Sequence, residues 1–236
     1  MPHCTPDRSP GLRSDLSHNH EEKTMFEKYR TKLLISLLII FIMLATIPGV
    51  YINKKSKSPA PQPTAHVDVE GIGIHHIEIE VEQYGTIRLE LDGDTAPITV
   101  QNFLDLANAG FYDGLTFHRI IDGFMIQGGD PDGKGTGGAD HNIIGEFAEN
   151  GYENNILHKK GVISMARAAD PNSASSQFFI MVGDADSPDG KYAAFGHVTE
   201  GQEIVDQIAA DAKPIDTNGT MPKSRQPVIT AVRVVD

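Results

Sequence analysis

Residues 117–130, Phe-His-Arg-Ile-Ile-Asp-Gly-Phe-Met-Ile-Gln-Gly-Gly-Asp, place a permanent cation, an uncharged amide and large apolar side chains close together. Residues two apart in a strand share a face, so Arg119, Met125 and Gln127 have the same parity on either side of a break at Gly123. A guanidinium beside apolar surface can donate hydrogen bonds without gaining or losing a proton. The combination suits a reaction that moves charge within an amide and breaks no bond.

Other patterns that could carry chemistry are weaker. Residues 133–138 (Gly-Lys-Gly-Thr-Gly-Gly) match G-x-G-x-x-G but lack the preceding strand and following helix of a dinucleotide site, so we interpret them as a surface loop. His75 and His76 point to opposite faces of a predicted strand, and we predict no metal site. Ser164 and Ser176 lack a G-x-S-x-G turn, and the sequence assigns no base to either, which argues against a hydrolase.

Charge is unevenly distributed along the chain. Residues 1–63 carry nine Lys/Arg and five Asp/Glu, whereas residues 64–236 carry eleven and twenty-seven. An acidic domain repels phosphate backbones, so we predict no nucleic-acid partner. Cys4 is the single cysteine, which excludes an internal disulfide and a thiolate metal cluster. We interpret the glycosylation sequon Asn218-Gly219-Thr220 as a turn.

The N-terminal part predicts a membrane anchor. Residues 33–52 contain no charge, are flanked by lysines and arginines, and are about as long as a bilayer-spanning helix needs to be. We expect residues 1–32 to be a cytoplasmic tail, 33–52 an uncleaved signal-anchor, and 53–73 an extended Pro/Lys/Ser-rich linker. A cleaved signal peptide, which would make the protein secreted, is the alternative, and Met25 is a second possible start. Residues 74–236 then form a domain that we place outside the cytoplasm.

The elements of this domain follow from its periodicity. Residues 77–82 and 87–91 alternate strictly and predict two half-buried strands joined by a tight turn. Thr95 before Pro97 predicts the cap of a helix that Gly110 ends. Many short strands, two helices and no βαβ rhythm predict a mainly β fold, a closed antiparallel barrel capped by helices. The remaining predicted strands are 115–120, 125–128, 161–165, 177–181, 194–198 and 228–235, with a second helix at 204–210.

Together with 117–130, three further motifs carry a family resemblance. They are Ser-Met-Ala-Arg-Ala at 164–168, Ser-Ser-Gln-Phe-Phe-Ile at 175–180 and Asp-Gly-Lys-Tyr-Ala-Ala-Phe-Gly at 189–196. From about Ile74 to Val235 the chain resembles the cyclophilin-type peptidyl-prolyl cis-trans isomerases, in a bacterial-like and membrane-anchored form. The resemblance implies an eight-stranded barrel with two helices. It also implies an isomerase that assists protein folding, needs no cofactor, binds proline-containing peptides and unfolded or exported proteins, and has a monomeric catalytic domain.

The resemblance also implies the roles of individual residues. Arg119 would be the catalytic arginine, with Gln127 beside it as a second catalytic residue. A pocket for the proline ring and a groove for the peptide would be formed by His118, Phe124, Met125, Ala166, Arg167, Gln177, Phe179, Pro188 and Tyr192. Tyr192 stands where the family commonly has histidine.

The physical chemistry of the prolyl bond agrees with these roles. The barrier to rotation is about 18–20 kcal/mol, because nitrogen shares its lone pair with the carbonyl. In the twisted transition state the prolyl nitrogen becomes a hydrogen-bond acceptor, and Arg119 can donate to it more strongly than in the ground state. Two other classes stay open: a non-catalytic chaperone or adaptor that binds proline segments in the same groove, and a hydrolase.

Three positions depart from the family pattern. Arg167 stands where many relatives carry asparagine, and we expect an altered charge preference near the groove more than lost activity. Ser187 stands where cyclosporin-sensitive relatives have tryptophan, and Pro188 replaces the usual leucine. We therefore expect weak binding of cyclosporin.

Overall fold

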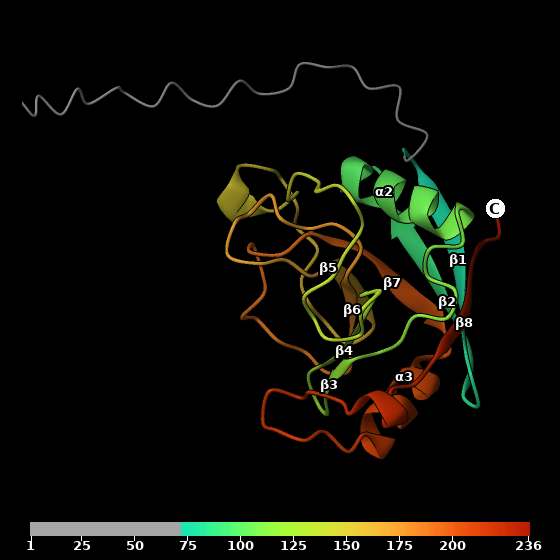
Figure 1. Ribbon diagram of the computed structural model, residues 1–236. Helices are drawn as coiled ribbons and strands as arrows, with labels where there is room; N and C mark the ends of the chain where they lie inside the picture. Colours follow the sequence, from blue (N-terminus) through green and yellow to red (C-terminus); the bar gives the residue numbers. More distant parts are fainter. Residues whose placement is uncertain (1–71) are drawn as a thin grey trace, which may run out of the picture. The chain divides into compact units, whose positions relative to one another are not determined.

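The computed structural model describes residues 72–236, which form one antiparallel sheet of eight strands with two α-helices and two short 3-10 helices (Figure 1). The predicted segments 1–32 and 33–52, and almost all of the linker at 53–73, lie outside the described residues. Among residues 72–236, no helix is both long and apolar enough to cross a bilayer. In chain order the elements are β1 (Ile74–Val81), β2 (Gly85–Asp92), α2 (Pro97–Asn108), β3 (Arg119–Ile121), β4 (Met125–Gly128), η1 (Ala148–Asn150), β5 (Val162–Met165), β6 (Phe178–Met181), β7 (Ala194–Glu200), α3 (Gln202–Asp211), η2 (Lys223–Arg225) and β8 (Ile229–Val234).

The first hairpin has the structure that its alternation predicts. Ile77, Ile79 and Val81 of β1 are buried, as are the apolar residues of β2, while the charged residues between them reach solvent. β1 and β2 pair antiparallel from Ile74–Asp92 to Val81–Gly85. Most other strands were predicted to within a few residues of their observed bounds, but β3 is only three residues long instead of six.

The sheet is not the closed barrel that the sequence predicted. Its strand order is β3-β4-β6-β5-β7-β2-β1-β8, so β3 and β8 are its two ends and do not pair with each other. β3 is too short for a long ladder, and Pro227 ahead of β8 has no N–H to donate. Loops cover both ends instead: Ile229 N donates to Leu115 O at 2.8 Å, and Ile120 N donates to Gly219 O at 2.8 Å. The architecture is an open half-barrel.

The two helices lie at opposite ends of the sheet (Figure 1). Val100 and Phe103 of α2 and Val205 and Ile208 of α3 are completely buried and join the main core. That core also contacts one face of β3, β4, β6 and β5. Their register aligns four isoleucines in a single row that is at most 1% exposed: Ile120, Ile126, Ile180 and Ile163. Because side chains alternate along a strand, the neighbouring row must face away from this core.

The N-terminus of α2 is capped from a distance. The predicted cap, Thr95, is wrong: its hydroxyl donates to Asp92 Oδ2 at 2.7 Å, and the residue at the cap position is Ala96. The buried Glu146 takes this role, since its carboxylate accepts from Ile98 N at 3.1 Å, Thr99 N at 2.8 Å and Thr99 Oγ1 at 2.7 Å. Burial raises the pKa of Glu146, and the hydrogen bonds from Thr99 oppose this effect. A negative group at a helix N-terminus also interacts favourably with the helix dipole.

Replacing Glu146 by alanine should therefore destabilise the domain by about 1–3 kcal/mol, because three donors at the start of α2 lose their acceptor in a buried setting. Urea unfolding of the full-length chain, followed by circular dichroism, measures the change. Glu149→Ala, at an exposed position three residues further on, is the matched control and should shift stability by less than about 0.5 kcal/mol. Equal effects of the two substitutions would contradict the assignment of Glu146 as the cap.

Candidate functional site

A cavity of about 470 Å³ opens on the face of the sheet that points away from the main core. This volume is within the range of small-ligand and peptide side-chain sites. Its walls combine aromatic and aliphatic side chains with three cations, and no carboxylate lines it. The lining residues are Arg119, Phe124, Met125, Gln127, Ala166, Arg167, Phe179, Ser187, Pro188, Lys191 and Tyr192.

Strand register sets the centre of this site. Arg119 of β3 pairs with Gln127 of β4, Gln127 pairs with Phe179 of β6, and Phe179 pairs with Ser164 of β5. These four residues therefore form a row across the sheet, next to the core-facing isoleucine row. The shared parity of Arg119, Gln127 and Met125 predicted from the sequence is confirmed by this pairing. A guanidinium and an aromatic ring are thus held two strands apart on one rigid surface.

Arg119 is fixed by acceptors on two sides. Its Nε donates to Asn218 O at 2.8 Å and its Nη2 to Asn218 Oδ1 at 3.3 Å, while its Nη1 donates to Gln127 Oε1 at 3.1 Å. Nη1 also donates to Met125 Sδ, a weak acceptor, at 3.8 Å. Four of the five N–H groups are used in this way, so one N–H of Nη2 can point at a ligand. Burial lowers the pKa of Arg119, with opposing effects from Tyr192 and Asp216, but a guanidinium stays charged at any physiological pH.

The bond from Arg119 to Gln127 is the first of a directed series. Gln127 Nε2 donates to Gln177 Oε1 at 2.9 Å, and Gln177 Nε2 donates to the carbonyl of Gly137 at 2.7 Å. Arginine can only donate and a carbonyl can only accept, so the orientation of both glutamine amides follows from the two ends of the series. We call these four residues, Arg119, Gln127, Gln177 and Gly137, the amide relay.

The floor of the cavity is Phe179, which is itself supported from below. Its ring stacks on the ring of His158, with centroids 5.8 Å apart and planes 17° apart, and Tyr192 meets it edge-on at 5.7 Å. Phe179 belongs to a small apolar cluster separate from the main core, with Met125, Val162, Met181 and Ala194. An apolar floor of this kind can hold a ring by dispersion and burial without any hydrogen bond.

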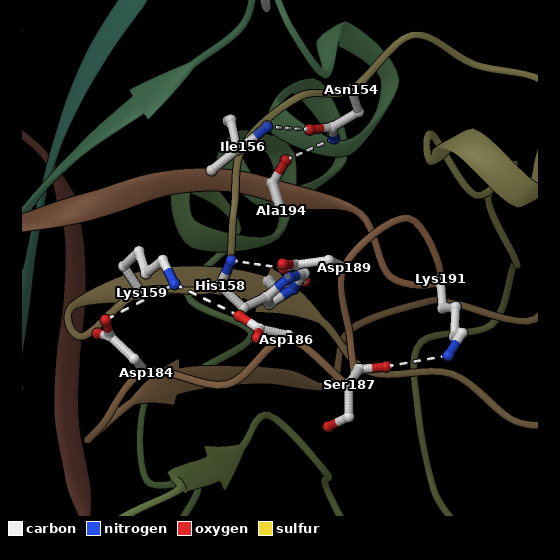
Figure 2. A network of polar contacts seen from close by, with 11 residues as sticks. Asn154, Ile156, His158, Lys159, Asp184, Asp186, Ser187, Asp189, Lys191 and Ala194 are labelled. Atoms are coloured by element: carbon white, nitrogen blue, oxygen red, sulfur yellow. Dashed lines mark hydrogen bonds and ion pairs between the residues drawn. The ribbon is translucent and has the colours of Figure 1, made fainter.

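His158 connects the floor to the rim of the cavity. Its backbone N and its Nδ1 bond Asp189 Oδ1 at 2.7 and 2.8 Å, which ties the 184–191 segment to the chain ahead of β5 (Figure 2). Its Nε2 lies 3.0 Å from Ser164 Oγ. With Nδ1–H donated to the carboxylate, Nε2 accepts from the serine hydroxyl, so the neutral ring satisfies both contacts.

Burial lowers the pKa of His158, and the Asp189 carboxylate opposes this effect. Burial acts to raise the pKa of Asp189, but the two hydrogen bonds from His158 hold it below its ordinary value. Figure 2 shows that Lys159 pairs with Asp184 and Asp186 of the 184–191 segment, and that Lys191 Nζ donates to Ser187 O within this segment. The rim is therefore held by a polar network behind the cavity wall.

The contacts of Asp189, His158 and Ser164 follow the order of a Ser-His-Asp triad, and no sequence pattern pairs these residues. The arrangement cannot act on a substrate as it stands, because Ser164 and His158 are both 0% exposed and Phe179 covers the ring. A nucleophile must reach a position about 3 Å from the reacting carbon, and nothing can approach Ser164 to that distance. In this structure the three residues support Phe179, the floor of the cavity.

The loop at 133–138, which matches a dinucleotide pattern, is held by a carboxylate and is not arranged around a phosphate. Asp130 accepts from the backbone N–H groups of Asp132, Lys134 and Thr136 at 2.8–3.0 Å, and from that of Gly135. Burial acts to raise the pKa of Asp130, but these bonds hold it below its ordinary value. The loop carries Gly137, the last member of the amide relay. Among residues 72–236 no group of three or more His, Cys, Asp or Glu is arranged to hold a metal.

Nine of the eleven predicted site residues line the cavity. Gln177 lines an adjoining cavity of about 350 Å³, which shares Gln127, Ala166 and Arg167 with the first. His118 lines neither: it is 4% exposed, lies against Gly135, and has no hydrogen-bond partner for its ring nitrogens among the described residues. Burial lowers the pKa of His118. A direct contact between His118 and substrate therefore has no support from the geometry.

Sequence reasoning missed four residues of the site. Asn218 lies 99 positions after the arginine that it holds, and its only signal was a turn-forming Asn-Gly pair. His158 and Asp189 are 31 positions apart; His158 belongs to no pattern, and Asp189 begins a quoted motif but received no role. Lys191 was part of a quoted motif but received no role. Each is brought to the cavity by the tertiary fold alone.

Comparisons with known proteins identify the same region. The family model described as "Cyclophilin type peptidyl-prolyl cis-trans isomerase/CLD" matches residues 76–234. Peptidyl-prolyl cis-trans isomerase-like 1 of Rhizopus delemar is 46% identical over 125 residues, which are 52% of this chain and 74% of that protein. The peptidyl-prolyl cis-trans isomerase of Helicobacter pylori is 47% identical over 126 residues, with 52% and 74% covered.

A solved structure also matches, that of a Cryptosporidium parvum cyclophilin type isomerase crystallised in the presence of the dipeptide Ala-Pro. It is 29% identical, with a TM-score of 0.60, and the match covers 68% of this chain and 99% of that one. Family model, relatives and fold agree on one assignment. The chain belongs to the cyclophilin type peptidyl-prolyl cis-trans isomerases, and its enzyme class is peptidyl-prolyl cis-trans isomerase.

Proposed function

We propose that this protein accelerates cis–trans exchange of X–Pro bonds by hydrogen bonding from Arg119 to the twisted prolyl amide. The observation that carries the proposal is the position of its guanidinium, which is fixed by Gln127 and Asn218 at the wall of a cavity whose floor is Phe179. One N–H group of Arg119, on Nη2, has no acceptor in the described residues and can meet a bound amide. No proton transfer is needed.

The energetics of the prolyl bond suit this arrangement. Cis and trans forms differ by about 0.5–1 kcal/mol, so the enzyme has to lower a barrier and need not shift an equilibrium. A donor that meets the prolyl nitrogen only when its lone pair leaves conjugation binds the transition state more tightly than the substrate. Because the amide relay already fixes Arg119, little reorganisation is needed at the moment of reaction.

The apolar floor gives the other half of the proposal. A proline ring over Phe179, between Phe124, Met125 and Tyr192, would stay in place while the acyl side of the bond rotates. The Cryptosporidium parvum relative was crystallised in the presence of Ala-Pro, which supports proline-containing peptides as ligands of this chain too. We propose that residues Ala166, Arg167, Gln177, Pro188 and Tyr192 flank such a peptide.

We further propose that the protein assists the folding of exported proteins while anchored to a membrane by residues 33–52, with residues 74–236 outside the cytoplasm. The uncharged run, its flanking cations and the proline-rich stretch after it support this placement. Mass spectrometry of the native N-terminus tests it, since cleavage between the run and residue 74 would leave the protein secreted and not anchored.

Arg119→Ala should lower kcat/KM for an X–Pro peptide by about 10²-fold or more, because the donor to the twisted amide is lost. Arg119→Lys should recover only part of the activity, since an ammonium keeps the charge but lacks the planar fork. Exchange NMR on a short X–Pro peptide with the full-length chain measures the rate without a coupled protease.

Arg225→Ala removes an exposed arginine outside the cavity and is the control for loss of one positive charge. Equal exchange rates for the wild type and Arg119→Ala would remove Arg119 from the mechanism. Peptide binding without any exchange in the wild type would favour a proline-binding adaptor, and new peptide products would indicate hydrolysis.

The neutral state of His158 predicts how stability depends on pH. Its pKa is lowered in the folded protein, so between that value and about 6.5 only the unfolded chain takes up a proton at this position. The free energy of unfolding should therefore fall as pH is lowered from about 7 to 5, and fall less steeply in His158→Gln. Urea unfolding at several pH values measures both slopes, with the exposed His197→Gln as the control for loss of an imidazole. Parallel slopes for the wild type and His158→Gln would be the contrary result.

Cyclosporin should bind weakly, with a dissociation constant above about 1 μM. Ser187 stands exposed at the rim of the cavity and lacks the apolar area of the tryptophan that cyclosporin-sensitive relatives carry there. Isothermal calorimetry measures the affinity, and Ser187→Trp should increase it. A tight complex of the wild type with cyclosporin would show that binding does not require a tryptophan at position 187.

A further inference from the structure

The cavity carries a charge opposite to that of its domain. Arg119, Arg167 and Lys191 line it, and neither this cavity nor the adjoining one is lined by an aspartate or glutamate. Residues 64–236, in contrast, contain eleven Lys/Arg and twenty-seven Asp/Glu. Three of the eleven cations of this region therefore line one cavity.

These three cations have no ion pair among residues 72–236, which is also true of Lys134, Lys213, Lys223 and Arg225 outside the first cavity. Within residues 72–236, no carboxylate lies within 4.0 Å of the charged groups of Arg119, Arg167 or Lys191. Elsewhere in the described part of the chain several cations are neutralised locally: Arg88 by Glu78 and Glu200, Lys159 by Asp184 and Asp186, Lys160 by Asp206, and Arg233 by Asp113. The positive charge at the cavity is thus available to a bound molecule.

Arg167 is held ready for such a contact. Its guanidinium carbon lies 4.9 Å from the centre of the Tyr192 ring and 5.0 Å from that of Phe147, so the group sits against two aromatic faces. Its Nε donates to Lys191 O and its Nη1 to Ala168 O, both at 2.9 Å. Its Nη2 makes no hydrogen bond to residues 72–236. A fixed planar group with one free edge can bind a carboxylate with little loss of side-chain entropy.

The position of Arg167 relates this charge to the substrate. It lines both cavities, with Gln127 and Ala166 as the other shared walls. An extended peptide advances about 3.3 Å per residue, so a chain with its proline over Phe179 brings the next one or two side chains past Arg167. Lys191 adds a second charge at the same rim, where its Nζ lies 3.3 Å from Ser187 O (Figure 2).

We propose that the preferred substrates are X–Pro segments with a glutamate or aspartate at one of the two positions before the proline or at the position after it. The proposal rests on the isomerase function proposed above and names its substrate class. The net acidity of the domain does not oppose it, because charges further away than about 8–10 Å are largely screened at physiological salt, whereas the cations at the rim are in contact range. Local charge therefore decides the preference.

The test uses peptides of equal length that carry Glu, Gln or Lys at one position: the first or second before the proline, or the first after it. Exchange NMR with the full-length chain gives kcat/KM for each peptide. At one of these positions, kcat/KM of the wild type should be about fivefold higher for the Glu peptide than for the Gln peptide, and lowest for the Lys peptide. A fivefold ratio is the size expected of a partly exposed charge pair. The Glu/Gln ratio should approach one at high salt.

Arg167→Gln should bring the Glu/Gln ratio close to one, whatever happens to the absolute rates, and Arg167→Gln with Lys191→Gln should remove what remains. Arg225→Gln makes the same charge change outside the cavity and should keep the wild-type ratio. A wild-type ratio near one at all three positions, or a ratio that survives the double substitution, overturns the proposal. Absence of exchange for every peptide would instead overturn the isomerase function on which it rests.

Discussion

The site depends on the direction of three consecutive hydrogen bonds. The amide relay begins at a group that can only donate, the guanidinium of Arg119, and ends at one that can only accept, the carbonyl of Gly137. Reversing either glutamine amide would place donor against donor or acceptor against acceptor, so one orientation is far more stable than the other. The same bonds join β3, β4, the residue before β6 and the 133–138 loop. Asp130 in turn holds that loop through its backbone N–H groups.

Local patterns predicted the strands well and their assembly less well. Alternation located the first hairpin, and the parity of Arg119, Met125 and Gln127 placed them on one face, because a strand has only two faces. Closure of the sheet depends on how its end strands meet, which no local pattern encodes. The prediction of the helix cap was wrong for a similar reason. Thr95 has a suitable side chain, but the carboxylate that accepts from the first turn of α2 belongs to Glu146, 47 positions after Thr99.

The candidate site was predictable to the extent that its residues are consecutive in the chain. The 117–130 run and the motifs at 164–168, 175–180 and 189–196 contain all the cavity residues except Ser187 and Pro188, which directly precede the last motif, and the fold brings them together. Contacts between distant single residues left no trace in the sequence, as with Asn218 on Arg119 and Asp189 on His158. The buried contact of His158 with Ser164 shows that residue types alone do not indicate function. Asp189, His158 and Ser164 in an open cleft would suggest a nucleophile, but here the ring of Phe179 covers His158 and the three residues support the cavity floor.

The covered ends of the half-barrel have a consequence for a protein proposed to work on unfolded chains. An open sheet edge is a template on which any extended polypeptide can add a strand, and such pairing leads to aggregation. Here residues 113–117 lie along β8, where Asp113 Oδ1 also accepts from Val232 N, and residues 218–221 lie along β3. Unfolded chains can then be recognised through side chains in the cavity and not through their backbone. A foldase built in this way can meet aggregation-prone chains repeatedly without becoming part of the aggregate.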